Sequence, residues 1–577
     1  MIKDDLISLI QHAAKKAQKA GDLPPFDLPP IVVEQPKNAE YGDYATNVAM
    51  QSARLARMAP IKIAEQIVRY WPDAPFVGKV DVAPPGFINI SLDDGWLAQQ
   101  VAVIQASPAS FGNSDVGQGR KAQVEFVSAN PTGPLTIGHA WGAVLGDSIA
   151  SLLQATGWDV TREYYFNNGG RQMRLLGESL QVRCLELLGE YRAIPQDGYQ
   201  GDYLRWVAAA LYAEYGDALV EKDVDFFRTK AVDAIFANIR CTLDRLGIRF
   251  DVYYNELDLY ESGRVNAAVQ ALASSGYAYQ KDGATWLRAT DLGLKQDRVI
   301  IKSSGEPTYR MPDIAYHVHK MQRGFDYVVD IFGADHHATW PDVLAGVRAL
   351  GYNTDGIKVI IHQFITLLRD GQEVKMSTRR GEFVTIDSLL DDITSETIPG
   401  KDVMRFTLLT RSPDSSMIFD LDLVVKQSSE NPVYYVQYGH ARISSILRKA
   451  ADEGFGLDTA DAYSTSGLSA DAYLTGRLAQ GDLSLLVHPS ELALLRKMVA
   501  LPEVIANAAE QLAPHQLSHY AQELATQFHA FYRDCRVVSS DPADRELTRA
   551  RLRLCEAARI VLARALGLMG VTAPEKM

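Results

Sequence analysis

The alternation of apolar and polar residues divides the 577-residue chain into three regions. In residues 1–107, short strand-like runs mix with helical segments, which predicts a small α+β domain. In residues 119–430, apolar runs such as YVVDIFG and KVIIHQF alternate with helical segments, as in a Rossmann-like parallel sheet. In residues 431–577, apolar residues recur at helical spacing and predict an all-helical bundle. We therefore expect a multidomain fold, α/β followed by α.

The sheet region begins with the strand KAQVEFVSAN and a helix over 138–156, followed by the strand WDVTREYYF and a helix over 171–189. Residues of about 190–290 hold longer helices and the hairpin-like YAYQKDGATWLRA, and we expect them to form an insertion in the sheet domain. Further helices are expected over 46–70, 93–105, 490–514, 517–535 and 545–569.

Composition narrows the functional classes. The hydrophobic content of 47% and charged content of 22% are those of a folded globular protein, and no apolar run reaches the roughly 18 residues of a membrane span. The N-terminal segment is amphipathic and carries acids, so we do not expect a secretory signal. Four scattered cysteines argue against a disulfide framework or a thiolate zinc site and favour the cytoplasm. The net charge of −13 argues against a general nucleic-acid coat but permits a local basic face.

The segment ANPTGPLTIGH, residues 129–139, places a rigid Pro/Gly turn between the first strand of the sheet and a helix. Backbone N–H groups and the positive end of the helix dipole at Gly138 would face the carboxyl edge of the sheet, which suits phosphate groups. Gly138, Gly142 and Gly146 share one helical face and allow the helix to lie close to the sheet. Taken alone, glycines at this spacing are explained by packing, and a single histidine such as His139 is more often structural than catalytic.

The segment EVKMSTRRGEFVTIDSLL places Lys375, Arg379 and Arg380 in a Gly/Ser/Thr-rich loop before a helix. Alone, such a loop is usually a solvated surface. A cationic loop is also what a pyrophosphate leaving group needs, because negative charge develops there during displacement. The IGH turn and the KMS loop on one α/β background together predict an ATP site.

These two segments resemble the HIGH and KMSKS signatures of class I aminoacyl-tRNA synthetases, and the chain is similar to arginyl-tRNA synthetases of the bacterial type. The resemblance covers nearly the whole chain and is carried, in order, by YGDYATNVAM, ANPTGPLTIGH, DGATWLRATDLGLKQDRVIIKSSGEPTYRMPDIAYHVHK, GADHH, KMSTRRG, YVQYGHARI and MGVTAPEKM. It implies a Rossmann-like catalytic domain, an N-terminal domain that contacts the tRNA elbow and a C-terminal anticodon-binding bundle. It also implies ATP with Mg²⁺, L-arginine and tRNA(Arg) as substrates, with no structural zinc and no membrane. We expect a monomer.

Two positions depart from the signatures. Thr136 stands where the first histidine of HIGH is usual, and it can hydrogen-bond a phosphate but cannot carry charge. Thr378 stands where KMSKS has its second lysine, so Arg379 or Arg380 would have to compensate, and the sequence does not distinguish between them.

The resemblance implies roles for individual residues. The ATP-binding and catalytic set would be Thr136, Gly138, His139, Lys375, Met376, Ser377 and Arg379. The arginine-binding set would be Glu125, Asn130, His139, Tyr309, Asp313 and His336. A guanidinium is bound best by carboxylates, so a site for arginine needs acids near the IGH turn. We expect Asp313 and Tyr309 at the guanidinium end, and Asn130 with Glu125 nearer the α-amino end. The ordinary alternatives are a helix N-cap for Asp313 and an edge-strand aromatic for Tyr309.

The C-terminal region is expected to bind tRNA. Residues 545–577 contain seven Lys/Arg against three Glu, and Arg545, Arg549 and Arg553 are spaced one turn apart, as phosphate contacts would be. A solvated basic face is the equal alternative. The candidate tRNA-contacting residues are Tyr435, Tyr438, Arg442, Arg549 and Met577, with Tyr41, Tyr44 and Asn47 as weaker candidates in the N-terminal region. Unpaired bases stack on aromatic or planar groups, which is why tyrosines and arginines are favoured here.

The activity implied is formation of arginyl-adenylate and pyrophosphate, followed by transfer of arginine to the 3′ end of tRNA, with activation requiring bound tRNA. Three rivals remain. The first is a synthetase of the same class for another amino acid, lysine above all. The second is a metal-dependent hydrolase, suggested by Asp335, His336 and His337 with His317 and His319 upstream. The third is an inactive tRNA-binding relative, suggested by Thr136 and Thr378.

Overall fold

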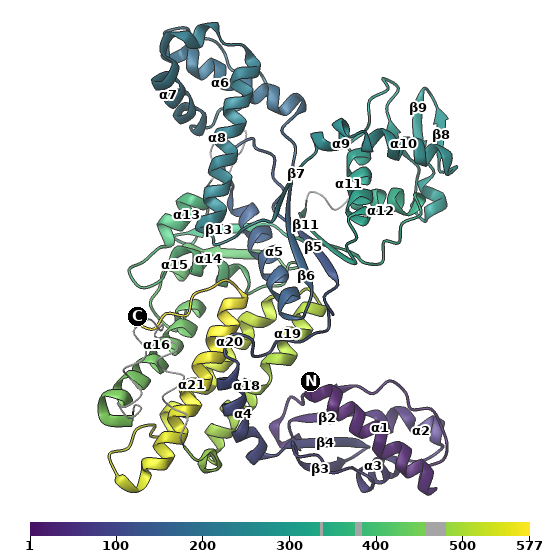
Figure 1. Cartoon of the computed structure of the whole chain (residues 1–577), viewed down its shortest axis with the longest axis vertical. Helices are drawn as coiled ribbons and strands as arrows, with labels where there is room; N and C mark the ends of the chain where they lie inside the picture. The colour runs from purple at the N-terminus through teal and green to yellow at the C-terminus, as the bar shows by residue number, and fades with distance from the viewer. Residues whose placement is uncertain (335–338, 375–383, 456–480) are drawn as a thin grey trace.

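The computed structural model describes residues 1–334, 339–374, 384–455 and 481–577. Within these residues, the centre of the molecule is a five-stranded parallel sheet with the strand order β12-β11-β5-β6-β7 (Figure 1). Its strands and its first helix are β5 (Lys121–Glu125), α5 (Ile137–Ala155), β6 (Asp159–Phe166), β7 (Val252–Asn255), β11 (Tyr327–Gly333) and β12 (Ile357–His362). Every adjacent pair is parallel, because each strand is followed by a crossover segment rather than a hairpin.

Two long excursions leave the carboxyl ends of β6 and β7. The first is helical and consists of α6 (Gly170–Leu187), α7 (Tyr203–Tyr215) and α8 (Val224–Arg245). The second consists of α9 (Leu257–Glu261), α10 (Arg264–Ser274), β8 (Ala278–Lys281), β9 (Ala284–Leu287), β10 (Arg298–Ile301) and α11 (Arg310–Gln322), and α12 (Trp340–Ala349) follows β11. In Figure 1 these two units stand apart at the upper left and upper right of the sheet.

The structure has two separate insertions where the sequence predicted a single one over about 190–290. Strand β7 lies inside that range and hydrogen-bonds along β6 as the edge of the central sheet. The short VYYN strand was missed because the pattern around it is that of the surrounding helices. The expected hairpin in YAYQKDGATWLRA is present as β8 and β9, which pair antiparallel.

The N-terminal region is built around a small sheet with the order β1-β2-β4-β3. Its elements are α1 (Ile2–Ala20), β1 (Val33–Glu34), β2 (Tyr44–Thr46), α2 (Val48–Ala56), α3 (Pro60–Arg69), β3 (Val77–Ala83) and β4 (Phe87–Leu92). The single helix expected over 46–70 is two helices. Arg57 adopts a left-handed conformation with φ 51°, and Ala59 is extended before Pro60, which opens α3.

After β12 the chain forms β13 (Ile365–Arg369), β14 (Gln372–Glu373), α13 (Ile386–Ile393), α14 (Gly400–Leu408), β15 (Met417–Asp420) and α15 (Leu421–Val424). The C-terminal bundle contains α16 (Pro432–Ala450), α18 (Pro489–Val499), α19 (Leu501–Glu510), α20 (His515–Asp534) and α21 (Arg545–Leu568). The helix expected over 490–514 is broken between α18 and α19, because Pro502 has no N–H to continue the helix. The multidomain α/β plus α architecture is confirmed.

Helix α4 (Asp94–Ala106) forms where the sequence predicts a helix, but it packs on α18 and α21 of the bundle. Gln105 of α4 accepts hydrogen bonds from the Arg553 guanidinium at 3.2 and 3.1 Å, and Asp94 accepts one from Arg496 at 2.8 Å. The N-terminal region therefore lies beside the helical bundle, and Figure 1 shows it at the lower right. Within the described part of the chain, no helix is long and apolar enough to cross a membrane.

Candidate active site

The loop after β5 turns sharply through two strained residues. Val127 and Ser128 have φ of 66° and 42°, and the N–H of Ser128 donates to the carbonyl of Phe126 at 2.9 Å. Positive φ is rare for a β-branched residue and is usually retained where function needs the backbone to be placed. The loop continues over ANPTGP to Thr136, which caps α5.

His139 closes a hydrogen-bonded cap at the start of α5. The backbone N–H of Thr136 donates to Nδ1 of His139 at 3.0 Å, and the Thr136 hydroxyl lies 3.1 Å from the same nitrogen. Because Nδ1 accepts a hydrogen bond from the backbone, the neutral ring carries its proton on Nε2. Gly138 is exposed at this helix start, where unpaired N–H groups and the helix dipole favour an anion.

The chain that follows the second signature meets the first signature at this point. Lys375, Met376, Ser377, Arg379 and Arg380 lie outside the described residues. The chain that follows them pairs with the cap of α5: Thr385 forms an antiparallel bridge with Thr136, and Ile386 donates its N–H to the carbonyl of Leu135 at 2.9 Å. The chain just after the KMS residues therefore contacts the IGH turn.

Small residues let α5 lie against the sheet, as expected. A Cβ at Gly146 would stand 2.2 Å from Cγ of Phe126, the residue that follows β5. A Cβ at Gly142 would stand 3.2 Å from Nε2 of His362 at the end of β12. Gly138 has no such neighbour and serves the helix start instead.

Three carboxylates form a row across the centre of the sheet. In the strand register, Asp330 of β11 lies beside Glu125 of β5, and Glu125 lies beside Glu163 of β6. All three side chains are buried. Three adjacent buried acids would repel one another strongly without compensating cations.

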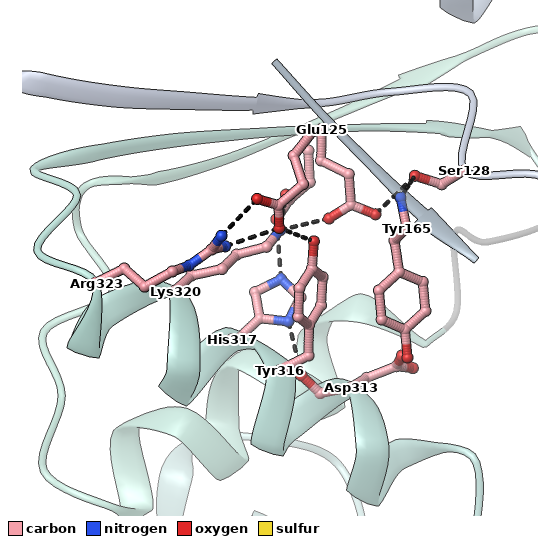
Figure 2. Close-up of polar contacts among 10 residues, drawn as sticks. Glu125, Ser128, Tyr165, Asp313, Tyr316, His317, Lys320 and Arg323 are labelled. Carbon is pink, nitrogen blue, oxygen red and sulfur yellow. Dashed lines mark hydrogen bonds and ion pairs between the residues drawn. The ribbon is translucent and has the colours of Figure 1, made fainter. Parts of the chain in front are cut away.

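Helix α11 covers this row and supplies the cations from one face (Figure 2). The ammonium of Lys320 donates to Glu125 at 2.5 Å and to Asp330 at 2.6 Å. The guanidinium of Arg323, one turn later, binds both oxygens of Glu163 at 2.6 and 2.7 Å. Burial opposes ionisation of Glu163 and Asp330, but hydrogen bonds and charge from Arg323, Lys320 and His317 hold their pKa values below the usual range.

His317 connects this row to Asp313. Its Nε2 lies 2.9 Å from Asp330, and its Nδ1 lies 2.8 Å from the backbone carbonyl of Asp313 one turn earlier. The Asp313 carboxylate points toward the Tyr165 hydroxyl (Figure 2). Burial raises the pKa of Asp313 to about 7, and the negative charges of Glu256 and Glu125 act in the same direction, while His317 and Lys320 oppose the shift. Among the described residues no cation forms an ion pair with Asp313, so this acid is suited to receive one.

Glu256, which the sequence did not single out, contacts the same tyrosine, Tyr165. It follows β7 directly and accepts a hydrogen bond from the Tyr165 hydroxyl at 3.0 Å. Burial raises the pKa of Glu256, although hydrogen bonds from Tyr165 and Asn167 reduce that effect. The signal that could have found it is its place after a strand, but that strand was itself missed.

The other predicted arginine-site residues are placed differently. Asn130 is exposed, and its amide accepts from the N–H of Asn167 at 2.9 Å, which ties it to the end of β6. Tyr309 is the N-cap of α11 and is 91% exposed, so the structure does not place it against Asp313. His336 lies outside the described residues. Asp313 is in the first turn of α11 and is not its cap.

The residues predicted to contact tRNA gather partly on one face of the bundle. Arg442 lies 5.7 Å from the ring of Tyr438 and 4.7 Å from that of Tyr532, and both rings are more than a third exposed. Tyr435 and Tyr438 both contact the ring of His529 on α20. The sequence did not indicate His529 and Tyr532, because only the packing of α20 against α16 brings them beside Tyr438 and Arg442.

The remaining candidates are distributed elsewhere. Met577 packs half-buried on the core, and Arg549 pairs with Glu546 at 2.8 Å. Arg553 is buried against Gln105 and is not part of an exposed basic face. Tyr44 is 2% exposed and donates its hydroxyl to Glu503 at 3.1 Å, so the expectation that it touches tRNA is wrong, whereas Tyr41 is exposed.

The histidines that suggested a metal site have other partners. Both nitrogens of His317 are in hydrogen bonds within the pocket, and Nδ1 of His319 accepts from Arg264 at 3.3 Å. Among the residues that the structure describes, no group of three His, Cys, Asp or Glu side chains is arranged to hold a metal ion. Asp335, His336 and His337 are not among them.

The parallel sheet leads through the IGH turn into α5, and the chain returns to that helix start at Thr385 and Ile386, after the KMS residues. Together with the family models below, this arrangement places the chain among the class I aminoacyl-tRNA synthetases. The model of the family "tRNA synthetases class I (R), catalytic domain" matches residues 102–401. The "Arginyl tRNA synthetase N terminal domain" matches residues 4–92, and the "DALR anticodon binding domain" matches residues 436–577.

Two relatives narrow the class to one family, and a solved structure shares the fold. An arginine–tRNA ligase from Desulfotalea psychrophila is 45% identical over the full length of both chains. One from Salinibacter ruber is 44% identical over 96% of this chain and 97% of its own. The arginyl-tRNA synthetase of Thermus thermophilus, 22% identical, shares the fold over both complete chains with a TM-score of 0.73. The chain belongs to the arginyl-tRNA synthetase family.

Proposed function

We propose that this chain is an arginine–tRNA ligase that activates L-arginine with ATP and transfers it to the 3′ end of tRNA(Arg). The observation that carries the substrate assignment is the acidic pocket beside the IGH turn. Asp313 and Glu256 approach the Tyr165 phenol from different elements (Figure 2) and have raised pKa values, and among the described residues neither carboxylate forms an ion pair. A planar guanidinium with five N–H donors can satisfy two carboxylates at once.

On the arginine side, we assign the guanidinium to Asp313 and Glu256 and the α-amino group to Glu125 and Asn130. The charges of Glu256, Asp313 and Glu125 all act on the Tyr165 hydroxyl, which supports a single pocket. Tyr309 is exposed in this structure, so its expected contact with arginine requires it to turn or move over the pocket once the substrate is bound. His336 is retained as a candidate contact on the strength of the resemblance alone.

On the ATP side, the start of α5 with Gly138 and the Nε2–H of His139 would face the phosphates. Lys375, Met376, Ser377 and Arg379 would bind ATP and stabilise the leaving pyrophosphate. The bridge between Thr136 and Thr385 supports this pairing, because it brings the end of the KMS segment to the helix start. Mg²⁺ would enter with the ATP phosphates, since it is usually held by phosphate oxygens and water.

Two displacements complete the reaction. A carboxylate oxygen of arginine attacks the α-phosphorus of ATP, the bond to the β,γ-pyrophosphate breaks, and arginyl-adenylate forms. A terminal ribose hydroxyl of the tRNA then attacks the arginyl carbonyl carbon, and AMP leaves. Neither step needs a covalent bond to the protein, so the chain contributes in-line positioning and charge stabilisation.

On the tRNA side, Tyr435, Tyr438 and Arg442, with His529 and Tyr532, would stack on unpaired bases. An exposed guanidinium flanked by rings suits that contact. Arg549 and Met577 remain candidates elsewhere in the C-terminal region, and Tyr41 and Asn47 are candidates in the N-terminal region.

Charging of total tRNA with labelled arginine or lysine tests the proposed function. We expect charging with arginine and none above background with lysine. A lysine-charging enzyme, or an enzyme that charges neither, would contradict it. Pyrophosphate exchange with arginine, measured with and without tRNA, tests the requirement for bound tRNA, and equal rates would contradict that requirement.

A further inference from the structure

Lys320 is a fully buried lysine whose ammonium joins two strands of the sheet. It lies between Glu125 of β5 and Asp330 of β11, at 2.5 and 2.6 Å, and 4.4 Å from the ring of Tyr316 (Figure 2). Burying an ammonium is costly unless carboxylates compensate it. The two carboxylates do so and keep the pKa of Lys320 above its usual value against the effect of burial.

The Glu125 carboxylate is held from both sides but keeps acceptor capacity. One oxygen accepts from Lys320, and the other accepts from the Ser128 hydroxyl at 3.0 Å. Ser128 is itself fixed, because its hydroxyl oxygen accepts the N–H of Tyr165 at 3.1 Å. Each carboxylate oxygen can accept two hydrogen bonds, so Glu125 has room for a further donor.

The neighbouring ion pair provides a contrast. Glu163 accepts three hydrogen bonds, one from Tyr316 at 2.6 Å and two from Arg323. Arg323 is the C-cap residue of α11, three residues after Lys320, and pairs with the next strand of the sheet. The two ion pairs are thus equivalent in their structural role, but only that of Lys320 contains a residue assigned to the substrate.

We propose that Lys320 is a positioning residue for the α-amino group of arginine, acting by fixing the orientation of the Glu125 carboxylate. The inference rests on the proposed function, because it assumes that arginine occupies this pocket. It predicts that loss of the Lys320 contact weakens recognition of the α-amino group specifically. A purely structural role would weaken binding of every ligand of the pocket alike.

The test compares arginine with its analogue that lacks the α-amino group, by calorimetry on the full chain with tRNA bound. The variant K320M/D330N removes the ammonium and one of its two carboxylates together, so that the net charge is kept while Glu125 loses its cation. The matched control is R323M/E163Q, which removes the adjacent ion pair without touching Glu125. The milder pair K320R and R323K keeps the charges and serves if the double variants do not fold.

In the wild type we expect arginine to bind more tightly than the analogue. We expect this preference to fall roughly tenfold or more in K320M/D330N, the scale of a hydrogen bond to a charged group, and to be unchanged in R323M/E163Q. K320R should reduce the preference severalfold, because a guanidinium differs from an ammonium in size and geometry and would hold Glu125 differently. R323K should leave the preference intact, because its partner Glu163 is not assigned to the substrate.

Equal losses of affinity for arginine and the analogue in the Lys320 variants would overturn the inference, as would equal binding of both ligands by the wild type. Failure of the wild type to bind arginine in preference to lysine would instead overturn the proposed function. The two failures are therefore distinguishable.

Discussion

Replacement of Asp313 by asparagine distinguishes the effect of this carboxylate on the stability of the fold from its effect on arginine binding. Asparagine has nearly the shape of the protonated acid but cannot ionise. Arginine then loses a buried ionic partner, and breaking such a pair typically costs about 3–5 kcal/mol. We expect the arginine KM to rise on the order of a hundredfold or more in D313N, with the KM for ATP little changed.

The same substitution should not destabilise the empty enzyme. Burial raises the pKa of Asp313 from 3.8 to about 7, so the folded chain holds a proton that the unfolded chain releases at lower pH. This carboxyl therefore favours folding most below pH 3.8, and that contribution is lost as the pH rises toward 7. In D313N the loss is absent, so at pH 8 the variant should unfold at a temperature equal to or above that of the wild type.

Steady-state charging and thermal unfolding of the same preparations check both expectations. A D313N variant with an unchanged arginine KM would refute the assignment of Asp313 to the guanidinium. A variant with markedly lower stability at pH 8 would refute the reasoning about its ionisation. The KM for ATP in the same preparations provides the control for general damage to the site.

Other variants test separate parts of the site. H139A should lower adenylate formation roughly a hundredfold to a thousandfold, as loss of a preorganised donor does, with tRNA binding retained in a gel-shift assay; near-normal turnover would contradict the role of His139. R442A or Y438A should weaken tRNA binding by roughly 1 kcal/mol or more per stacked base without changing the arginine affinity. A variant that loses both tRNA binding and arginine affinity would point to unfolding instead. G146A should lower the melting temperature, because its Cβ would stand 2.2 Å from Phe126; an unchanged melting temperature in G146A would contradict the close packing of α5.

Local patterns were enough for the parts of the fold that depend on them. The strand, turn and helix around His139 follow from the Pro/Gly turn and the small residues of α5, and the bundle follows from helical spacing. Strand β7 was missed because four residues carry little period, and with it Glu256 was missed. The breaks at Pro60 and Pro502 could have been read from the prolines themselves.

The acidic row could not be predicted in this way. Asp330, Glu125 and Glu163 come from three strands, and only the register of the sheet places them side by side. The pairing of Lys320 and Arg323 with that row depends in turn on how α11 crosses it. Tyr44 shows the converse, since an aromatic that looks available in the sequence is covered by contact with Glu503 of a distant helix.

The acidic site beside the IGH turn is proposed to select arginine. The most direct measurement is kcat/KM for charging of tRNA(Arg) with arginine and with lysine by the same enzyme. A site with two carboxylates facing a planar guanidinium predicts a preference for arginine of at least about a thousandfold, because lysine leaves buried acceptors unpaired. A preference near unity, or one in favour of lysine, would contradict the account.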